Sequence, residues 1–135
     1  MITLKTGLPM GSGIHEKGSS RRHLFFAVEK SLNRLKTDRI VFYFIHRFDE
    51  STDIEETVRA LDDLQRKGKI LYPAVSNWAA WQIAKALGIS ERKSLAGFKL
   101  IQPMYNLVKL QANLQTKIQR VLRYYNNNCK DLGDN

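Results

Sequence analysis

Three hydrophobic runs that end in polar residues constrain the fold of this chain more than any other feature. The runs VFYFIHR, ILYPAVSN and FKLIQPMYN end at His46, at Ser76 with Asn77, and near Gln102. Each run is followed by apolar residues at helical spacing, an order typical of parallel strands joined by helices. Because the carboxyl ends of parallel strands meet at one edge of a sheet, we expect these polar side chains to share one rim.

The alternation of strand-like and helix-like segments predicts an α/β fold. We expect four parallel strands over residues 2–6, 40–45, 70–75 and 98–101, with helices between them that cover the sheet. The run from Ile40 to Ile45 is continuously apolar, which indicates a strand covered on both sides. A further amphipathic helix is expected at the C-terminal end, where apolar residues recur at steps of three and four from residue 107 to 125.

Helix starts can be predicted from side chains that accept hydrogen bonds from free backbone N–H groups. Thr52 and Glu55 have the spacing of a capping box ahead of the second helix. Ser76 or Asn77 is a suitable N-cap for the third. Pro73 is unexpected, because a proline in the middle of a covered strand removes one hydrogen-bond donor.

The basic charge of the chain does not indicate nucleic-acid binding. The 22 lysines and arginines outnumber the 13 acidic residues and give a net charge of +9. These charges are scattered, without five like charges in a row, so residues such as Arg59, Arg66 and Lys67 are interpreted as solvated helix surface. We therefore predict no nucleic-acid partner.

The cysteine count and the hydropathy point to a cytoplasmic protein. The single cysteine, Cys129, excludes an internal disulfide and every CxxC metal site, and it fits a reducing compartment. No segment approaches the ~18 consecutive apolar residues of a membrane span, and the apolar run at the start is too short for a signal peptide. We predict no metal site and no membrane partner.

The polar strand ends form a candidate active site. Histidine can act as a general acid or base, because its ordinary pKa lies near neutrality. The hydroxyl of Ser76 and the amides of Asn77 and Gln102 can pair with a bound carboxamide as donors and acceptors. The alternatives are a structural role for His46, N-capping by Ser76 or Asn77, and a surface amide at Gln102.

These residues lie in motifs that carry a family resemblance. The chain contains ITLKTGLPMG, SRRH, AVEKSLNRLKTDRI, IHRFDESTDIEETVRALDDLQRKGKI, AVSNWAAWQIAKAL and IQPMYNLVK. Over roughly residues 2–109 it resembles aldo-keto reductases of the bacterial type, which are also similar to voltage-gated potassium channel β subunits. The resemblance implies a (β/α)8 TIM barrel that binds NADPH at its C-terminal rim and reduces a small-molecule aldehyde or ketone by hydride transfer.

The same resemblance implies roles for individual residues. His46 in IHRFD matches the active-site histidine of the family, and Lys5 in ITLKTG matches its active-site lysine. Ser76 and Asn77 in VSNW match residues that hold the nicotinamide carboxamide, with Gln102 in IQPMYN as the third. For Lys5, the alternative is a strand lysine that faces water.

The departures from the family pattern are equally informative. The segment that carries the family's catalytic aspartate and proton-donating tyrosine has no match, and neither Tyr43 nor Tyr105 lies in that tyrosine's motif. We expect residues 1–109 to form a partial aldo-keto reductase barrel, about its strands three to six, and residues 110–135 to form a divergent helix and polar tail. The chain is then a fragment or degenerate relative that is inactive in isolation.

Two further expectations follow from a partial barrel. Its open sheet edges should pair with other chains, so we predict self-association. The alternative function is a non-catalytic, partner-binding module that resembles a potassium channel β subunit. Its docking face would be formed by Leu114, Ile118, Val121 and Tyr125.

Overall fold

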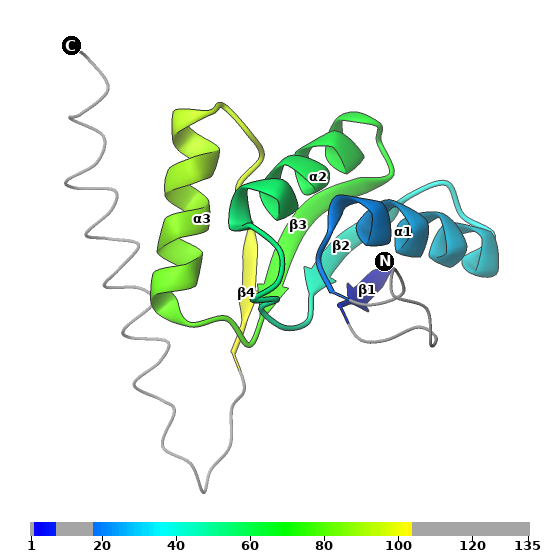
Figure 1. Cartoon of the computed structure of the whole chain (residues 1–135). Helices are drawn as coiled ribbons and strands as arrows, with labels where there is room; N and C mark the ends of the chain where they lie inside the picture. Colours follow the sequence, from blue (N-terminus) through cyan, green and yellow to red (C-terminus); the bar gives the residue numbers. More distant parts are fainter. Residues whose placement is uncertain (1, 8–17, 104–135) are drawn as a thin grey trace, which may run out of the picture.

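The computed structural model describes residues 2–7 and 18–103, which form one parallel sheet with three helices (Figure 1). The elements in chain order are β1 (Thr3–Thr6), α1 (Arg21–Leu35), β2 (Ile40–Ile45), α2 (Ile54–Arg66), β3 (Ile70–Ser76), α3 (Ala80–Arg92) and β4 (Leu100–Gln102). The strands pair in the order β1-β2-β3-β4, and every pair is parallel. The prediction of four parallel strands with covering helices is confirmed. The expected C-terminal helix and the division at residue 109 lie outside the described residues.

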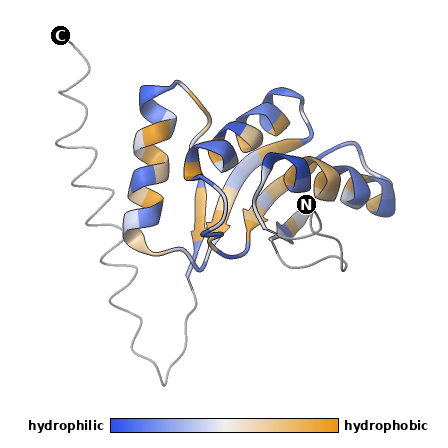
Figure 2. Cartoon of the chain, viewed as in Figure 1, coloured by the Kyte–Doolittle hydropathy of each residue, from blue (hydrophilic) through white to orange (hydrophobic). Residues whose placement is uncertain are grey.

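The three helices lie side by side over one face of the sheet (Figure 1). Alternate strand residues, Tyr43 and Ile45 in β2 and Val75 in β3, are at most 1% exposed and belong to the hydrophobic core. Each helix has an apolar stripe beside its charged surface (Figure 2). Burial of these stripes supplies most of the favourable free energy of folding. Within the described ranges, no helix is both long enough and apolar enough to cross a bilayer.

The opposite face of the sheet is not covered by any helix of the described part, and we call it the helix-free face. By strand alternation and register it includes Thr3, Lys5, Phe42, Phe44, Tyr72, Ala74 and Leu100. Tyr72 is 43% exposed and Leu100 is 39% exposed, although Phe44 is buried. Val41 and Phe42 are only half-buried, whereas Ile40 and residues 43–45 are buried, so β2 is incompletely shielded near these two residues. The sequence prediction for this strand is therefore correct in part.

Two helix starts differ from the sequence predictions. Helix α2 is capped by Asp53, whose carboxylate accepts from the backbone N–H of Glu55 at 2.7 Å. Thr52 instead donates its hydroxyl to Asp49. Helix α3 starts after Ala79, whose N–H donates to Oε1 of Gln82 at 2.7 Å. Ser76 and Asn77 are therefore not caps, which removes the structural alternative proposed for them.

Pro73 lies inside β3 without interrupting the sheet. Its carbonyl accepts from the N–H of Lys99 at 2.8 Å, on the side of β4. Because the N and C=O of one strand residue point to the same side, the missing donor of Pro73 also faces β4. Pairing with β4 begins only at Ala74 opposite Leu100. The β2–β3 ladder therefore loses no hydrogen bond.

Asp62 in α2 connects this helix to the segment that follows α3. It is 6% exposed, and its carboxylate accepts from the N–H of Ala96 at 2.8 Å and from Nε of Arg66 at 2.6 Å. We expect Asp62→Ala to lower the free energy of unfolding by about 1–3 kcal/mol, because the Ala96 N–H is left without an acceptor. Asp62→Asn retains an acceptor oxygen and should lower the free energy of unfolding by less than Asp62→Ala. Urea unfolding of both variants at one protein concentration checks this order, and equal losses would contradict it.

Candidate functional site

The polar residues at the ends of the strands are joined by hydrogen bonds at one edge of the sheet. The N–H of His46 donates to the carbonyl of Thr6 at 2.7 Å, and Nδ2 of Asn77 donates to the carbonyl of His46 at 3.1 Å. The hydroxyl of Ser76 donates to the carbonyl of Gln102 at 3.0 Å. The structure therefore brings together the rim residues selected from the sequence, and it links the ends of all four strands.

Asn77 has the backbone conformation that this junction requires. Its φ is 57°, in the left-handed region that asparagine tolerates better than most residues. Its Nδ2 also donates to the hydroxyl of Ser76 at 3.2 Å, so both amide hydrogens are used. Within the described ranges, Oδ1 of Asn77 has no partner, and neither has the side-chain amide of the exposed Gln102. One acceptor and one complete amide are thus free to pair with a carboxamide.

His46 is half-buried and favours the neutral imidazole. Its Nδ1 is shielded from solvent and has no hydrogen-bond partner among the described residues. Burial lowers the pKa of His46 from its ordinary value, and the positive charges of Lys5 and Arg47 lower it further. Near neutral pH the ring is therefore uncharged, with one nitrogen as donor and the other as acceptor.

Lys5 lies on the helix-free face, two residues before the start of the loop that follows β1. Its side chain is exposed, and its ammonium group lies 5.9 Å from the centre of the Phe44 ring. Phe44 is its direct neighbour on β2. The positive charge of Lys5 lowers the pKa of His46, and Lys5 directly precedes Thr6, whose carbonyl accepts from the N–H of His46. The sequence alone did not identify Phe44, and the signal that could have found it is the register between β1 and β2.

The tyrosines of the described part do not reach this rim. Tyr43 is 1% exposed on the helix-covered face, and burial raises the pKa of its hydroxyl, which keeps it protonated. Tyr72 lies on the helix-free face and stacks against Phe42, with ring centres 5.4 Å apart. It is four residues before Ser76 on the same strand, which corresponds to roughly 13 Å. Neither hydroxyl can therefore donate to a carbonyl oxygen held beside His46.

Asp49 fixes the segment that follows His46, and sequence reasoning did not identify it. Its carboxylate accepts from the N–H of Ser19 at 2.7 Å, from the hydroxyl of Thr52 at 2.7 Å, and from both the N–H and the hydroxyl of Ser51. Partial burial alone would raise the pKa of Asp49, but these hydrogen bonds together lower it below its ordinary value. Asp49 therefore joins the loop after β2 to the chain just before α1.

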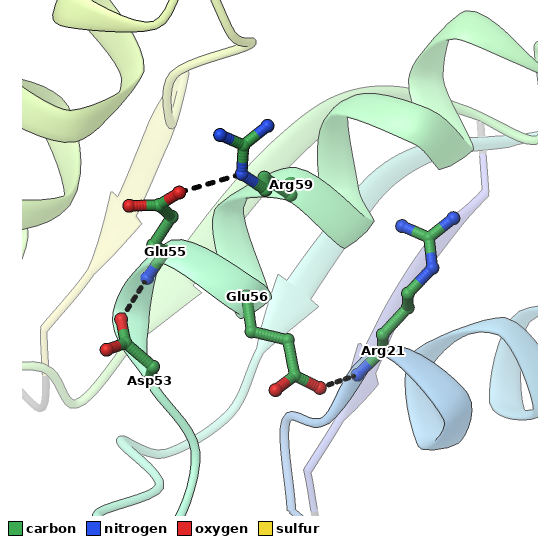
Figure 3. A pocket seen from close by; sticks show the side chains of 5 residues that line it. All are labelled: Arg21, Asp53, Glu55, Glu56 and Arg59. Carbon is green, nitrogen blue, oxygen red and sulfur yellow. Dashed lines mark hydrogen bonds and ion pairs between the residues drawn. The ribbon is translucent and has the colours of Figure 1, made fainter.

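A pocket of about 340 Å³ lies between the first turns of α1 and α2 (Figure 3). It is lined by Arg21, Asp53, Glu55, Glu56 and Arg59. Its charges are satisfied by their neighbours: Glu56 accepts from the N–H of Arg21 at 2.8 Å, and Glu55 pairs with Arg59 at 2.8 Å. This pocket therefore reflects packing between helices and does not belong to the strand-end site.

Comparison with known proteins agrees with this geometry. The model of the Aldo/keto reductase family matches residues 1–130. A probable voltage-gated potassium channel subunit beta from Arabidopsis thaliana is 42% identical over 97 residues, which are 72% of this chain and 30% of that protein. The aldo-keto reductase dtxS3 from Metarhizium robertsii is 44% identical over 95 residues, 70% of this chain and 26% of that protein.

A similar share of a third relative is covered. L-glyceraldehyde 3-phosphate reductase from Escherichia coli K12 is 31% identical over 108 residues, 80% of this chain and 31% of that protein. The chain thus spans less than a third of the length of these curated relatives. Its four parallel strands with covering helices correspond to part of a (β/α)8 barrel. On the family match and on this fold, the chain belongs to the aldo/keto reductase family.

Proposed function

We propose that this chain carries part of the active rim of an NADPH-dependent reductase that acts on small-molecule aldehydes or ketones. The observation that carries the proposal is the junction of strand ends, where Asn77 and Ser76 connect His46 to Gln102. Reductases are named among the relatives, which supports the reaction class. The single cysteine fits a reducing compartment, and we place the protein in the cytoplasm.

The rim residues have separate tasks in this proposal. NADPH supplies the hydride when it is bound. Oδ1 of Asn77 and the side-chain amide of Gln102 hold the carboxamide of the nicotinamide, while the hydroxyl of Ser76 keeps Asn77 and the end of β4 in place. The neutral ring of His46 offers a hydrogen bond to the carbonyl oxygen of the substrate, where negative charge develops. Lys5 adds a positive charge near the same oxygen.

The chain by itself is proposed to be inactive or nearly so. In this family a tyrosine donates the proton, and neither Tyr43 nor Tyr72 reaches the rim. The loss of a single hydrogen-bond donor to a developing oxyanion costs about 3–4 kcal/mol, which is a factor of 100 to 1,000 in rate. We therefore place the chain as a fragment or degenerate relative of a full reductase.

Two measurements test this proposal separately. With NADPH and an aromatic aldehyde, we expect NADPH to be oxidised no faster than without protein. NADPH oxidation that is faster than this and is lost in His46→Ala would overturn the proposal that the chain is inactive. Titration with nicotinamide mononucleotide, followed by NMR, should shift the side-chain amide resonances of Asn77 and Gln102. Thr37→Ala, in the connection between α1 and β2 and distant along the sequence, is a matched control that should leave these shifts unchanged. The absence of shifts in the unmodified chain would overturn the cofactor part.

A second candidate function is supported by the relatives. Probable voltage-gated potassium channel subunits beta occur among them in both Arabidopsis thaliana and Oryza sativa. In this alternative the chain is a non-catalytic module that binds a partner protein through Leu114, Ile118, Val121 and Tyr125, which lie outside the described residues. If the chain retains one defined partner protein in a pull-down, and deletion of residues 110–135 abolishes that binding, the result would favour this alternative over the reductase proposal.

A further inference from the structure

The contact between Lys5 and Phe44 connects the helix-free face to the strand-end site. The two residues are paired across β1 and β2, and the ammonium group lies 5.9 Å from the ring centre. This distance is within the ~6 Å over which a cation is attracted to the face of an aromatic ring. Phe44 is also two residues before His46, which directly follows β2, so strand alternation continued by one residue puts both side chains on the same side of the sheet.

Phe44 is more firmly held than Lys5. It is 7% exposed and lies in register between Lys5 and Ala74, which is itself fully buried. Lys5 is exposed on an edge strand, and a lysine side chain in water has many rotamers. The buried ring of Phe44 therefore has less conformational freedom than the exposed side chain of Lys5 beside it.

We propose that Phe44 is a positioning residue for Lys5, and that its ring holds the ammonium group beside His46 at the rim of the sheet. In this proposal Phe44 acts through Lys5 and has no role in contacting cofactor or substrate. The inference deepens the proposed function, because it rests on Lys5 and His46 acting together there. Its observable consequence is nevertheless a property of the unliganded chain: the positive charge of Lys5 acts on His46 through the position that Phe44 imposes.

The test is a double-mutant cycle on the pKa of His46, followed by NMR of the imidazole between pH 4 and 9. The charges that act on this ring are those of Lys5 on β1 and Arg47 beside it, and both disfavour the imidazolium. Lys5→Met should therefore raise the pKa of His46. Phe44→Leu should raise it too, partly by exposing the ring and partly by releasing Lys5.

The cycle separates these two contributions. In the Lys5→Met background, Phe44→Leu can act only by exposing the imidazole. We therefore expect Phe44→Leu to raise the pKa of His46 less in that background than in the unmodified chain. Phe44→Tyr retains the aromatic face and should leave the pKa of His46 close to that of the unmodified chain. Phe42→Leu, on the same strand and face but stacked on Tyr72 rather than on Lys5, is the matched control and should leave it unchanged. Equal rises in the two backgrounds would overturn the proposal.

A measurement on the unmodified chain keeps the test decisive if Phe44→Leu does not fold. A lysine above an aromatic ring has its Hε resonances displaced upfield by the ring current. We expect this displacement for Lys5 and not for Lys85, which is exposed and has no ring contact with any residue that the structure describes. Ordinary Hε positions for Lys5 would overturn the proposal. Neither measurement uses a cofactor or turnover, so failure here is distinguishable from failure of the reductase proposal.

Discussion

Gly18→Ala is expected to lower the free energy of unfolding by about 2–4 kcal/mol, through two additive costs. Gly18 has a φ of 89°, in the left-handed region where a side chain costs roughly 1–2 kcal/mol. A Cβ at this position would also lie 2.4 Å from Oδ2 of Asp49. That oxygen accepts from the N–H of Ser19 and the hydroxyl of Thr52, so it cannot move without weakening both hydrogen bonds.

Gly68→Ala is the matched control for this prediction. Gly68 has a φ of 69°, but a Cβ there would meet nothing within 4 Å. Gly68→Ala should therefore lower the free energy of unfolding only through the cost of the left-handed backbone, about 1–2 kcal/mol. Urea unfolding of both variants at one protein concentration measures the difference. Equal losses would mean that the carboxylate of Asp49 moves freely and does not fix the loop after β2.

Self-association of the 135-residue chain is the second large effect, and we propose it from the edges and the uncovered face of the sheet. Strands β1 and β4 each pair on one side only within the described residues. Unpaired edges template pairing with another chain. The helix-free face adds exposed apolar surface at Tyr72 and Leu100, which burial against a second chain would remove from water.

Sedimentation and light scattering over a range of concentrations measure this association. We expect a mass above that of the monomer, which falls when Tyr72→Lys and Leu100→Lys are combined. Trp81→Lys is the control, because Trp81 is 61% exposed but lies on α3, away from the helix-free face. A single sharp monomeric species with a cooperative thermal transition at every concentration would rule out self-association.

The sequence predicted the sheet and the rim because both depend on patterns along the chain. Apolar runs that alternate with helical periodicity determine parallel strands, and the polar residues after them can only lie at the carboxyl edge. The contacts of Asp49 were not predictable in the same way. Ser19 is thirty positions from Asp49 in the chain, and their hydrogen bond depends on how α1 and the loop after β2 pack.

Helix starts show the same limit at short range. Thr52 and Glu55 fit a capping box, yet Asp53 caps α2, because Asp49 is close enough to accept from the hydroxyl of Thr52. The contact of Lys5 with Phe44 depends on strand register, which the hydropathy of β1 and β2 leaves open. Sequence reasoning therefore missed contacts between separate elements and, in the loop before α2, the choice between neighbouring capping residues.

Pro73 disfavours one shift in the register of β4 relative to β3. Because its nitrogen faces β4 and carries no hydrogen, a carbonyl of β4 that slid down beside it would find no donor. A shift of β4 in that direction would exchange a satisfied carbonyl for an unsatisfied one. The proline would thus oppose such a shift, and in the observed register Gln102 lies opposite Ser76. Pro73, which the sequence made unexpected in a covered strand, thus favours the alignment of the ends of β3 and β4 at the rim.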